Sequence, residues 1–338
     1  MKCIIPAAGK GIRLRPHTLN KPKALLPLGN KPIIAHIVDK ILEANISDII
    51  IIVGFEKEKL KNFLLTNYSD KCNLTFIEQR ERRGLGHAIY LASKYLDGEP
   101  TIITLGDSLY ENSYISMLQE YDKCNTWDGL LTVREVSNPH SYGVVVTDPH
   151  SSIIKSMIEK PQDPISNKAI TGVYIIRNTK ALEDNLKDIV ETNFTGAGGE
   201  IQLTDALQKM IEKGFTLGVI DSGEWFDCGN KESLLEGNRF VLSSLQISEI
   251  KSEIINSSII HPVVIEAGCS ISNSIIGPNV SIAQETTVTR GIISSSIIGS
   301  GSIIKNVNIK NSIIGNEVSV EGELHDLNIG DNKEIQIS

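Results

Sequence analysis

Cysteine is scarce in this sequence: the 338 residues include five, and no two of them form a Cys-x-x-Cys pair. An odd number without such spacing excludes a disulfide framework, so we expect buried, reduced thiols and a cytoplasmic location. Long apolar runs are missing as well. No stretch approaches the ~20 apolar residues of a membrane span, and the apolar start is too short for a signal peptide. The sequence therefore predicts a protein without a membrane partner.

Acidic residues are absent from the first 38 positions, in a chain whose net charge is −8. The same stretch holds seven Lys or Arg, around the turn Gly9-Lys10-Gly11. Glycines let backbone N–H groups approach phosphate oxygens, and the cations neutralise the phosphate charge. A protein that binds nucleic acid would spread its basic residues over a broad surface. The clustering at one end instead predicts a small polyphosphate ligand and no nucleic-acid partner.

Up to about residue 225, apolar runs alternate with segments of helical periodicity, which predicts an α/β sheet. We expect strands at Lys2–Pro6, Asp48–Val53, 74–78, 101–105 and 216–220, and helices at 32–44, 56–65, 86–96 and 109–118. Ligands of such sheets bind at the carboxyl ends of the strands. The glycine turn and Gly106-Asp107 both follow strands, so we expect them to share one site.

Beyond residue 240 the composition changes to a repeat. The tetrad Ser-Ile-Ile-(Gly/His) begins at intervals of 16, 22 and 16 residues, at Ser258, Ser274, Ser296 and Ser312. Aliphatic residues recur every five or six positions, at Ile260, Ile265, Ile271, Ile276, Ile282, Val288, Ile293, Ile298, Ile304, Ile309, Ile314 and Val320. Three such steps make one triangular coil of a β-helix. Because 22 residues equal four steps, one coil should be irregular. We expect an α/β domain at 1–229, a linking helix at 230–249 and a β-helix domain at 250–338.

Two motifs frame the basic stretch: residues 9–16 are Gly-Lys-Gly-Ile-Arg-Leu-Arg-Pro and residues 22–27 are Pro-Lys-Ala-Leu-Leu-Pro. With them the sequence resembles the sugar-1-phosphate nucleotidylyltransferases, whose pattern is Gly-x-Gly-Thr-Arg-Leu-x-Pro, then Pro-Lys-x-Leu-Leu-Pro. The likeness covers nearly the whole chain and is greatest to the long-form glucose-1-phosphate thymidylyltransferases. It implies a Rossmann-like mixed-sheet nucleotidyltransferase domain followed by a left-handed parallel β-helix of hexapeptide repeats. Ile12 departs from the family's Thr, which removes a hydroxyl but no backbone N–H.

The resemblance implies nucleotidyl transfer from a pyrimidine nucleoside triphosphate to a hexose 1-phosphate, with glucose 1-phosphate as the expected acceptor. Positioning and charge neutralisation supply most of the catalysis in such a reaction. Arg13 would grip the β- and γ-phosphates, Lys23 the α-phosphate and Lys160 the sugar phosphate. Asp107 and Asp227 would hold the cofactor Mg²⁺, which takes one or two carboxylates beside phosphate and water oxygens. The alternative for Asp107 is to cap the helix expected at 109–118.

Other residues are implied to bind the substrates. Gln79 and the glycine after it read the base edge in the family, and a Gln amide matches the O4 and N3–H of uracil and thymine equally. Glu159 would accept hydrogen bonds from sugar hydroxyls. The full set implied to bind substrate is Ala8, Gly9, Gly11, Gln79, Gly84, Gly143, Glu159, Thr171, Gly172 and Trp225.

Some polar residues near these motifs are expected to be structural. We expect His87 to pack locally and the segment 199–205 to be structural, with a helix cap as one such role. Arg80, Arg82 and Arg83 resemble a solvated face, with an auxiliary phosphate contact as the alternative.

Two further functions stay open. A bifunctional uridylyltransferase and acetyltransferase would need a longer β-helix with a catalytic histidine between coils; His261 and His325 lie in the first and last coils. A non-catalytic regulatory subunit is disfavoured, because the cations and aspartates named above are all retained. The sequence also leaves dTTP and UTP open as donors. We expect a homo-oligomer, assembled through the flat faces of the β-helix.

Overall fold

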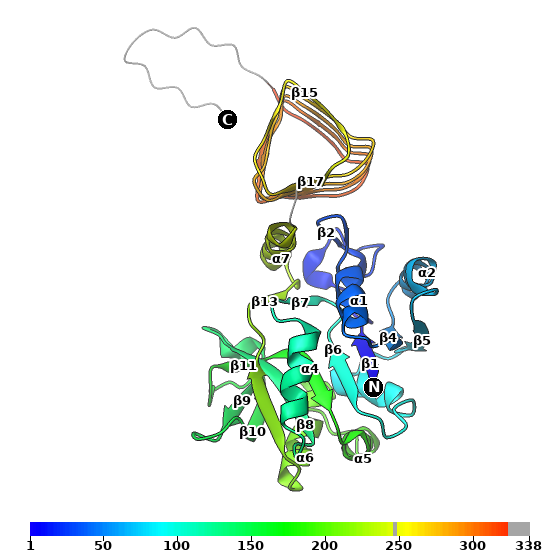
Figure 1. Cartoon of the computed structure of the whole chain (residues 1–338), viewed down its shortest axis with the longest axis vertical. Coiled ribbons are helices and arrows are strands. Elements are labelled where there is room, and N and C mark those ends of the chain that lie inside the picture. Colours follow the sequence, from blue (N-terminus) through cyan, green and yellow to red (C-terminus); the bar gives the residue numbers. More distant parts are fainter. Residues whose placement is uncertain (246–248, 324–338) are drawn as a thin grey trace. The chain divides into compact units, whose positions relative to one another are not determined.

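The computed structural model describes residues 1–245 and 249–323. The chain forms two compact units, one of Met1–Pro27 with Lys31–Gly237 and one of Leu28–Asn30 with the residues from Asn238 onward (Figure 1). The domain boundaries expected from the sequence stay a prediction. Residues 324–338, at the end of the expected β-helix domain, lie outside the described part.

A nine-stranded mixed sheet forms the centre of the first unit, in the order β10-β9-β11-β6-β1-β4-β5, with β8 beside β11 and β12 beside β8. Strands β1, β4, β5 and β6 are parallel, whereas β11 is antiparallel to β6, β8 and β9. This is the Rossmann-like mixed sheet that the resemblance implied. The strands are β1 Lys2–Pro6, β4 Asp48–Val53, β5 Asn73–Glu78, β6 Thr101–Thr104, β8 Gly129–Glu135, β9 Gly143–Thr147, β10 Ile154–Glu159, β11 Lys168–Ile176 and β12 Leu217–Asp221.

Helices accompany this sheet and bury its apolar faces. Helices α3, α5 and α6 pack against one another, and Ile89, Leu186 and Leu207 from these helices are completely buried with the sheet residues. The α-helices are α1 Ile33–Glu43, α2 Lys57–Tyr68, α3 Leu85–Ser93, α4 Tyr114–Lys123, α5 Thr179–Glu191, α6 Leu203–Glu212 and α7 Lys231–Ser244. Shorter elements are the 3-10 turns Ile12–Leu14, Lys23–Leu25, Pro139–Ser141 and Ala197–Gly199, and the strands β2 Pro27–Leu28 and β3 Lys31–Pro32.

The helix expected at 109–118 is the main error in this unit. Ser108–Tyr110 is a strand, β7, and the following helix α4 begins at Tyr114. Ser113 caps that helix, because its Oγ accepts a hydrogen bond from Ser116 N at 3.1 Å. Asp107 therefore does not cap a helix, and the structural alternative for it is removed.

The second unit contains a parallel β-helix, whose coils form a triangle when seen end-on (Figure 1). Its three parallel sheets have the orders β14-β17-β20-β23-β26, β15-β18-β21-β24-β27 and β16-β19-β22-β25, consistent with the expected left-handed β-helix. Ile271, Val288 and Ile304 stack in the interior, as predicted. The strands are β14 Glu249–Ile250, β15 Glu253–Ile255, β16 Ser258–Ile259, β17 Val263–Ile265, β18 Ser270–Ser272, β19 Ile275–Ile276, β20 Val280–Ile282, β21 Thr287–Thr289, β22 Ile292–Ser294, β23 Ile297–Ile298, β24 Ile303–Lys305, β25 Asn308–Lys310, β26 Ile313–Ile314 and β27 Ser319–Glu321.

Two details of the repeat prediction were wrong. Ile259, not Ile260, is in register with Ile276 and packs against the core, while Ile260 is 47% exposed. The coils are also regular: stacked positions in the sheet of β15 are 17, 17, 16 and 16 residues apart. The 22-residue interval arises because Ser274 precedes a strand of one sheet and Ser296 a strand of another.

One corner of the coils repeats asparagine in the left-handed backbone region. Asn256, Asn273 and Asn306 have φ values of 44°, 49° and 54°, and Arg290 occupies the same corner with a φ of 52°. Asn256 Nδ2 donates to Asn273 Oδ1 at 2.6 Å, whereas Asn306 Oδ1 is buried with no hydrogen-bond partner in the described part of the chain. Asparagine tolerates this backbone conformation better than arginine does.

We expect Arg290→Asn to raise the free energy of unfolding of the β-helix by about 1–2 kcal/mol. The new amide Nδ2 would donate to Asn306 Oδ1, as Asn256 does to Asn273 two coils earlier. Denaturant unfolding followed by circular dichroism measures the change. Arg290→Ala is the matched control, because it keeps the backbone strain without supplying a donor and should not stabilise. A variant Arg290→Asn no more stable than the natural chain would contradict this prediction.

Candidate active site

The glycine turn and Asp107 leave the central sheet at neighbouring strand ends. Strand β1 ends at Pro6 and leads into the turn, and its parallel neighbour β6 ends at Thr104, just before the Asp107 loop. Gly106 N donates to Pro6 O at 3.1 Å, which ties the two loops together. The expected juxtaposition of these two segments is therefore present.

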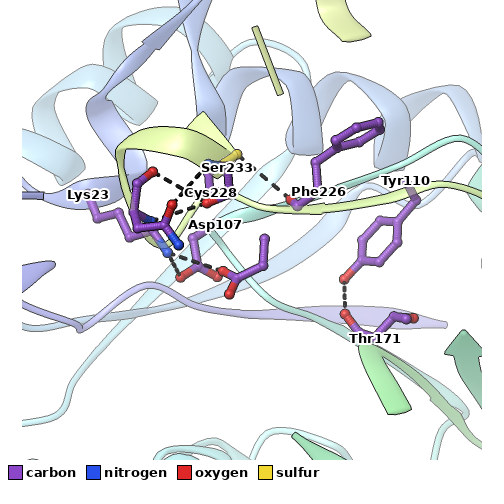
Figure 2. A network of polar contacts seen from close by, with 9 residues as sticks. Lys23, Asp107, Tyr110, Thr171, Phe226, Cys228 and Ser233 are labelled. Carbon is purple, nitrogen blue, oxygen red and sulfur yellow. Dashed lines mark hydrogen bonds and ion pairs between the residues drawn. The ribbon is translucent and has the colours of Figure 1, made fainter. Parts of the chain in front are cut away.

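Asp107 and Asp227 are brought together by a small antiparallel sheet. Strand β13 (Trp225–Asp227) pairs with β7 so that Asp227 lies opposite Ser108, the residue after Asp107. Lys23 contacts both carboxylates, and its contact with Asp107 can be followed in Figure 2. Its Nζ is 2.5 Å from Asp107 Oδ2 and 3.5 Å from Asp227 Oδ1. Residues from three distant parts of the sequence thus form one charged cluster.

Burial raises the free-energy cost of keeping the groups of this cluster charged. The side chain of Lys23 is only 11% exposed. Burial by itself lowers the pKa of the Lys23 ammonium group, but Asp107 and Asp227 more than offset this and raise the pKa. Burial, and then the charge of Asp107, raise the pKa of the Asp227 carboxyl. Two ionised aspartates here therefore favour the binding of a further cation.

The donor set fits Mg²⁺ bound together with a phosphate. Within residues 1–245 and 249–323, no group of three or more His, Cys, Asp or Glu side chains could hold a metal ion. Asp107 and Asp227 offer two converging carboxylates. Mg²⁺ usually takes one or two carboxylates and completes its octahedron with water and substrate phosphate oxygens. These two aspartates could hold Mg²⁺ in that way.

The glycine turn presents unpartnered backbone N–H groups. Among the residues that the structure describes, the N–H groups of Ala8, Gly9, Lys10 and Gly11 donate no hydrogen bond. Thr18 Oγ1 donates to Gly11 O at 2.6 Å and holds the end of the turn. Successive free N–H groups form a concavity that binds anions. The turn is therefore suited to phosphate, as expected for Ala8, Gly9 and Gly11.

Arg13 lies between this turn and the aspartates. It belongs to the 3-10 turn Ile12–Leu14, and a Cβ added at Gly229 would lie 2.7 Å from Arg13 Nη2. The guanidinium therefore rests against the backbone that follows Asp227. The neighbouring Ile12 side chain, which replaces the family's threonine, is exposed.

A cavity of about 820 Å³ opens next to the charged cluster. Eight of the predicted site residues line it: Arg13, Asp107, Gly143, Glu159, Lys160, Gly172, Trp225 and Asp227. The cavity wall does not include the predicted residues Ala8, Gly9, Gly11, Lys23, Gln79, Gly84 and Thr171. The glycine turn therefore lies outside the wall of this cavity, which the charged cluster borders.

Thr171 supports the cavity wall from behind. Its side chain is completely buried, and Thr171 Oγ1 donates to Thr132 Oγ1 at 2.7 Å. Thr171 O accepts a hydrogen bond from Tyr110 Oη at 2.9 Å (Figure 2). The resemblance assigned Thr171 to substrate binding, but its hydroxyl is used within the protein, while the neighbouring Gly172 lines the cavity.

Glu159 is held in place by a residue that the sequence analysis missed. Thr204 Oγ1 donates to Glu159 Oε2 at 2.7 Å. A Cβ at Gly143 would lie 2.7 Å from the same carboxylate oxygen, so a larger residue there would displace the Glu159 carboxylate. Lys160 follows in the left-handed region with a φ of 45°, and its Nζ is 3.8 Å from Glu159 Oε1. Backbone strain of this kind gathers at functional sites.

The segment 199–205 is more than structural. Gln202, Leu203 and Thr204 line the cavity, so assigning this segment to structure alone was incomplete. Its other end packs against the Gly84 loop: Gly86 N donates to Ile201 O at 2.9 Å. The only sequence signal for a role was its match in order to a segment of the resembling family.

Gln79 and Gly84 are directly connected. Gln79 is buried, and its Nε2 donates to Gly84 O at 3.0 Å and lies 3.4 Å from His87 Nδ1. His87 is also buried, which confirms the local packing expected for it. Gly84 has a φ of +109°, and a Cβ there would lie 2.4 Å from Ile201 O. Any other residue would push the loop off Ile201.

The comparisons with known proteins agree with this geometry. Residues 2–244 match the family described as "Nucleotidyl transferase". The chain belongs to the nucleotidyl transferase family. The matched range contains both aspartates, the glycine turn and every residue that lines the cavity.

The chain is similar over most of its length to several curated proteins. The chain is 33% identical over 272 residues to "Bifunctional protein GlmU" of Methanococcus aeolicus, a match of 80% of this chain and 62% of that protein. It is 34% identical to the protein of that name from Methanocaldococcus jannaschii, over 79% of this chain and 61% of the relative. The chain thus spans about three fifths of these relatives. It is 30% identical to "Glucose-1-phosphate thymidylyltransferase" of Streptomyces antibioticus, over 86% and 84% of the two chains.

Solved structures of family members share the fold. A putative glucose-1-phosphate thymidylyltransferase from Bacillus anthracis has a TM-score of 0.63 at 27% identity, covering 74% of this chain and 98% of that one. A UDP-glucose pyrophosphorylase complexed with UDP-glucose has a TM-score of 0.63 at 28% identity, covering 72% and 99%. In the described part of this chain, no helix combines the length and the apolar character needed to cross a membrane.

Proposed function

We propose that this chain transfers a nucleotidyl group from a pyrimidine nucleoside triphosphate to a hexose 1-phosphate, with glucose 1-phosphate as the preferred acceptor. The products are a nucleotide sugar and pyrophosphate. The observation that carries the proposal is the position of Lys23, whose buried Nζ contacts both Asp107 and Asp227 beside the glycine turn. Burying such charges is costly, and the arrangement suits a site that exchanges these contacts for phosphates and a metal ion.

In the proposed reaction, a phosphate oxygen of the sugar 1-phosphate attacks the α-phosphorus of the triphosphate. The new P–O bond forms as the bond between the α-phosphorus and the β-phosphate oxygen breaks, and its electron pair leaves with pyrophosphate. Both reactants are anions, so positioning them in line and neutralising their charge supply most of the catalysis.

The nucleotide half of the site would consist of the glycine turn and its cations. The free N–H groups of residues 8–11 would donate to phosphate oxygens. Arg13 would bind the β- and γ-phosphates with its planar fork, and Lys23 would move from the aspartates to the α-phosphate. Mg²⁺ held by Asp107 and Asp227 would neutralise further triphosphate charge.

The cavity would hold the sugar phosphate. Glu159, fixed by Thr204, would accept hydrogen bonds from sugar hydroxyls, and the strained Lys160 would bind the sugar phosphate group. Gly143 and Gly172 would let the backbone approach the sugar ring, with Trp225 on the same wall.

The preferred donors should carry a pyrimidine, with dTTP and UTP used far better than ATP or GTP. Gln79 Nε2 is engaged by Gly84 O, so its Oε1 is the atom left to accept the base N3–H. The methyl group that distinguishes thymine from uracil would contribute ~1 kcal/mol if it were buried. The family resemblance favours dTTP over UTP. A pyrophosphate-release assay with the four triphosphates and glucose 1-phosphate tests this. Release with none of them would reject the proposed function and support a non-catalytic role, and a preference for ATP or GTP would reject the role of Gln79.

The bifunctional alternative would require acetyl transfer by the β-helix. His261 is the only histidine in the β-helix strands and turns between residues 249 and 323, and His325 lies outside the described residues. No observation on these coils favours a second reaction, so the proposal ends at nucleotidyl transfer. We also propose a cytoplasmic location, which the five free thiols support.

We further propose a homo-oligomer formed through the sheet of β16, β19, β22 and β25. Ile275 and Ile292 are stacked in this sheet and both are exposed, whereas Val264 and Ile297, at outward positions of the sheet of β17 and β23, are buried. A flat face with stacked exposed isoleucines suits a second copy of the chain. Light scattering should give a multimer for the natural chain and a smaller mass for Ile275→Lys/Ile292→Lys. A natural chain of monomer mass would contradict this prediction.

A further inference from the structure

The three arginines before Gly84 have different environments. Arg80 is 85% exposed, and its Nε is 3.5 Å from Glu78 Oε2. Arg83 donates from Nη2 to Asn193 Oδ1, and its backbone O accepts Ile201 N at 2.6 Å. Arg82 extends across to the glycine turn instead, where its Nε donates to Ala8 O at 3.3 Å. Arg80 and Arg82 are exposed, as expected of a solvated face, whereas Arg83 is half-buried.

Arg82 is a cation without a carboxylate partner beside an anion-binding concavity. In residues 1–245 and 249–323 it forms no ion pair, and its two Nη groups donate no hydrogen bond. Ala8, whose carbonyl it contacts, is also the first of the four residues with free N–H groups. The Ala8 carbonyl is held in turn by Phe55 N at 3.3 Å. One edge of the planar guanidinium is thus fixed at the turn.

We propose that Arg82 is a further phosphate-binding residue, which contacts the triphosphate of the nucleotide substrate with its Nη groups. This inference rests on the proposed function. The Nε bond to Ala8 O orients the fork at the residue where the four free N–H groups begin. A guanidinium whose Nε is already bound still offers donors on both Nη atoms. Phosphate is the ligand that both features favour.

The test compares two probes on the full chain in the presence of MgCl₂: dTTP, and thymidine, which lacks phosphate. Dissociation constants are measured by calorimetry, directly for dTTP and by displacement for thymidine. Arg82→Met should weaken dTTP binding about tenfold and leave thymidine binding unchanged. Arg82→Gln, which keeps a donor for Ala8 O but removes the charge, should behave in the same way. Arg80→Met is the matched control and should bind both probes like the natural chain.

Each other outcome overturns the inference. Equal losses for dTTP and thymidine would mean that Arg82 acts on the base or the loop. Natural affinity in Arg82→Gln would mean that it only anchors the turn. If Arg80→Met weakened dTTP binding as much as Arg82→Met, the effect would come from the positive charge of the loop and not from Arg82 itself. If the natural chain bound no triphosphate, the proposed function and this inference would both be rejected. If the natural chain bound dTTP and the variants gave one of the outcomes above, the inference alone would be rejected.

Discussion

Replacing Asp227 by asparagine should lower turnover by roughly 10²–10³-fold, and Asp107→Asn should do the same. Each change removes one of the two carboxylates that converge on Lys23 and would hold Mg²⁺. Burial and Asp107 already raise the pKa of Asp227, so a neutral amide of the same shape should leave stability nearly unchanged. Initial rates of pyrophosphate release and thermal unfolding midpoints measure the two effects.

Asp221→Asn is the matched control for these variants. Asp221 ends β12, is exposed, and lies 3.7 Å from Arg134 Nη1, away from the charged cluster. It should keep natural activity. Excess EDTA should abolish activity of the natural chain, and added Mg²⁺ should restore it. Equal rates in EDTA and in magnesium would refute the metal assignment, even if the aspartate variants were inactive.

Arg13→Ala and Lys160→Ala should each cost at least ~30-fold in kcat/KM, but toward different substrates. Removing one partner of a desolvated charge contact costs ~2–5 kcal/mol. Arg13 contacts the backbone after Asp227, next to the glycine turn, whereas Lys160 is adjacent to Glu159 on the sugar side of the cavity. We therefore expect Arg13→Ala to raise KM for the triphosphate and Lys160→Ala to raise KM for the sugar 1-phosphate.

Two-substrate initial-rate kinetics distinguish these defects. Lys155→Ala is the control, because Lys155 lies on the same strand as Glu159 but is exposed and pairs with Asp148. It should match the natural chain toward both substrates. If Arg13→Ala and Lys160→Ala raised both KM values alike, the assignment of one residue to each substrate would be wrong.

Much of this site could be predicted from sequence because parallel strands place their carboxyl ends at one edge. That rule brought Asp107 to the glycine turn without further information. It could not place Asp227 beside Asp107, because the pairing of β7 with β13 is a contact between distant segments. Apolar residues at 109–118 also fit helical spacing, and only the structure showed that Leu109 and Tyr110 belong to a strand.

The same limits explain what was missed elsewhere. In the β-helix, spacing identified the coils, but adjacent isoleucines gave no sign that Ile259 rather than Ile260 faces the core. Thr204 is an ordinary helix-start residue by sequence, and its role depends on the distance to Glu159. Arg82 looked like its neighbours because side-chain direction in a loop has no periodicity.

The short segment from Ile201 to Thr204 connects the proposed nucleotide and sugar sides of the site. Ile201 packs against the Gly84 loop and Thr204 holds Glu159. A movement of the Gly84 loop on nucleotide binding would therefore be transmitted within four residues to the carboxylate on the sugar side. If that movement improves the pocket, each substrate should strengthen the binding of the other, because coupling between two sites is reciprocal. The preferences for the nucleotide donor and for the sugar acceptor would then depend on each other. A substitution at Thr204 that favours a different sugar would also change the affinity for the nucleotide.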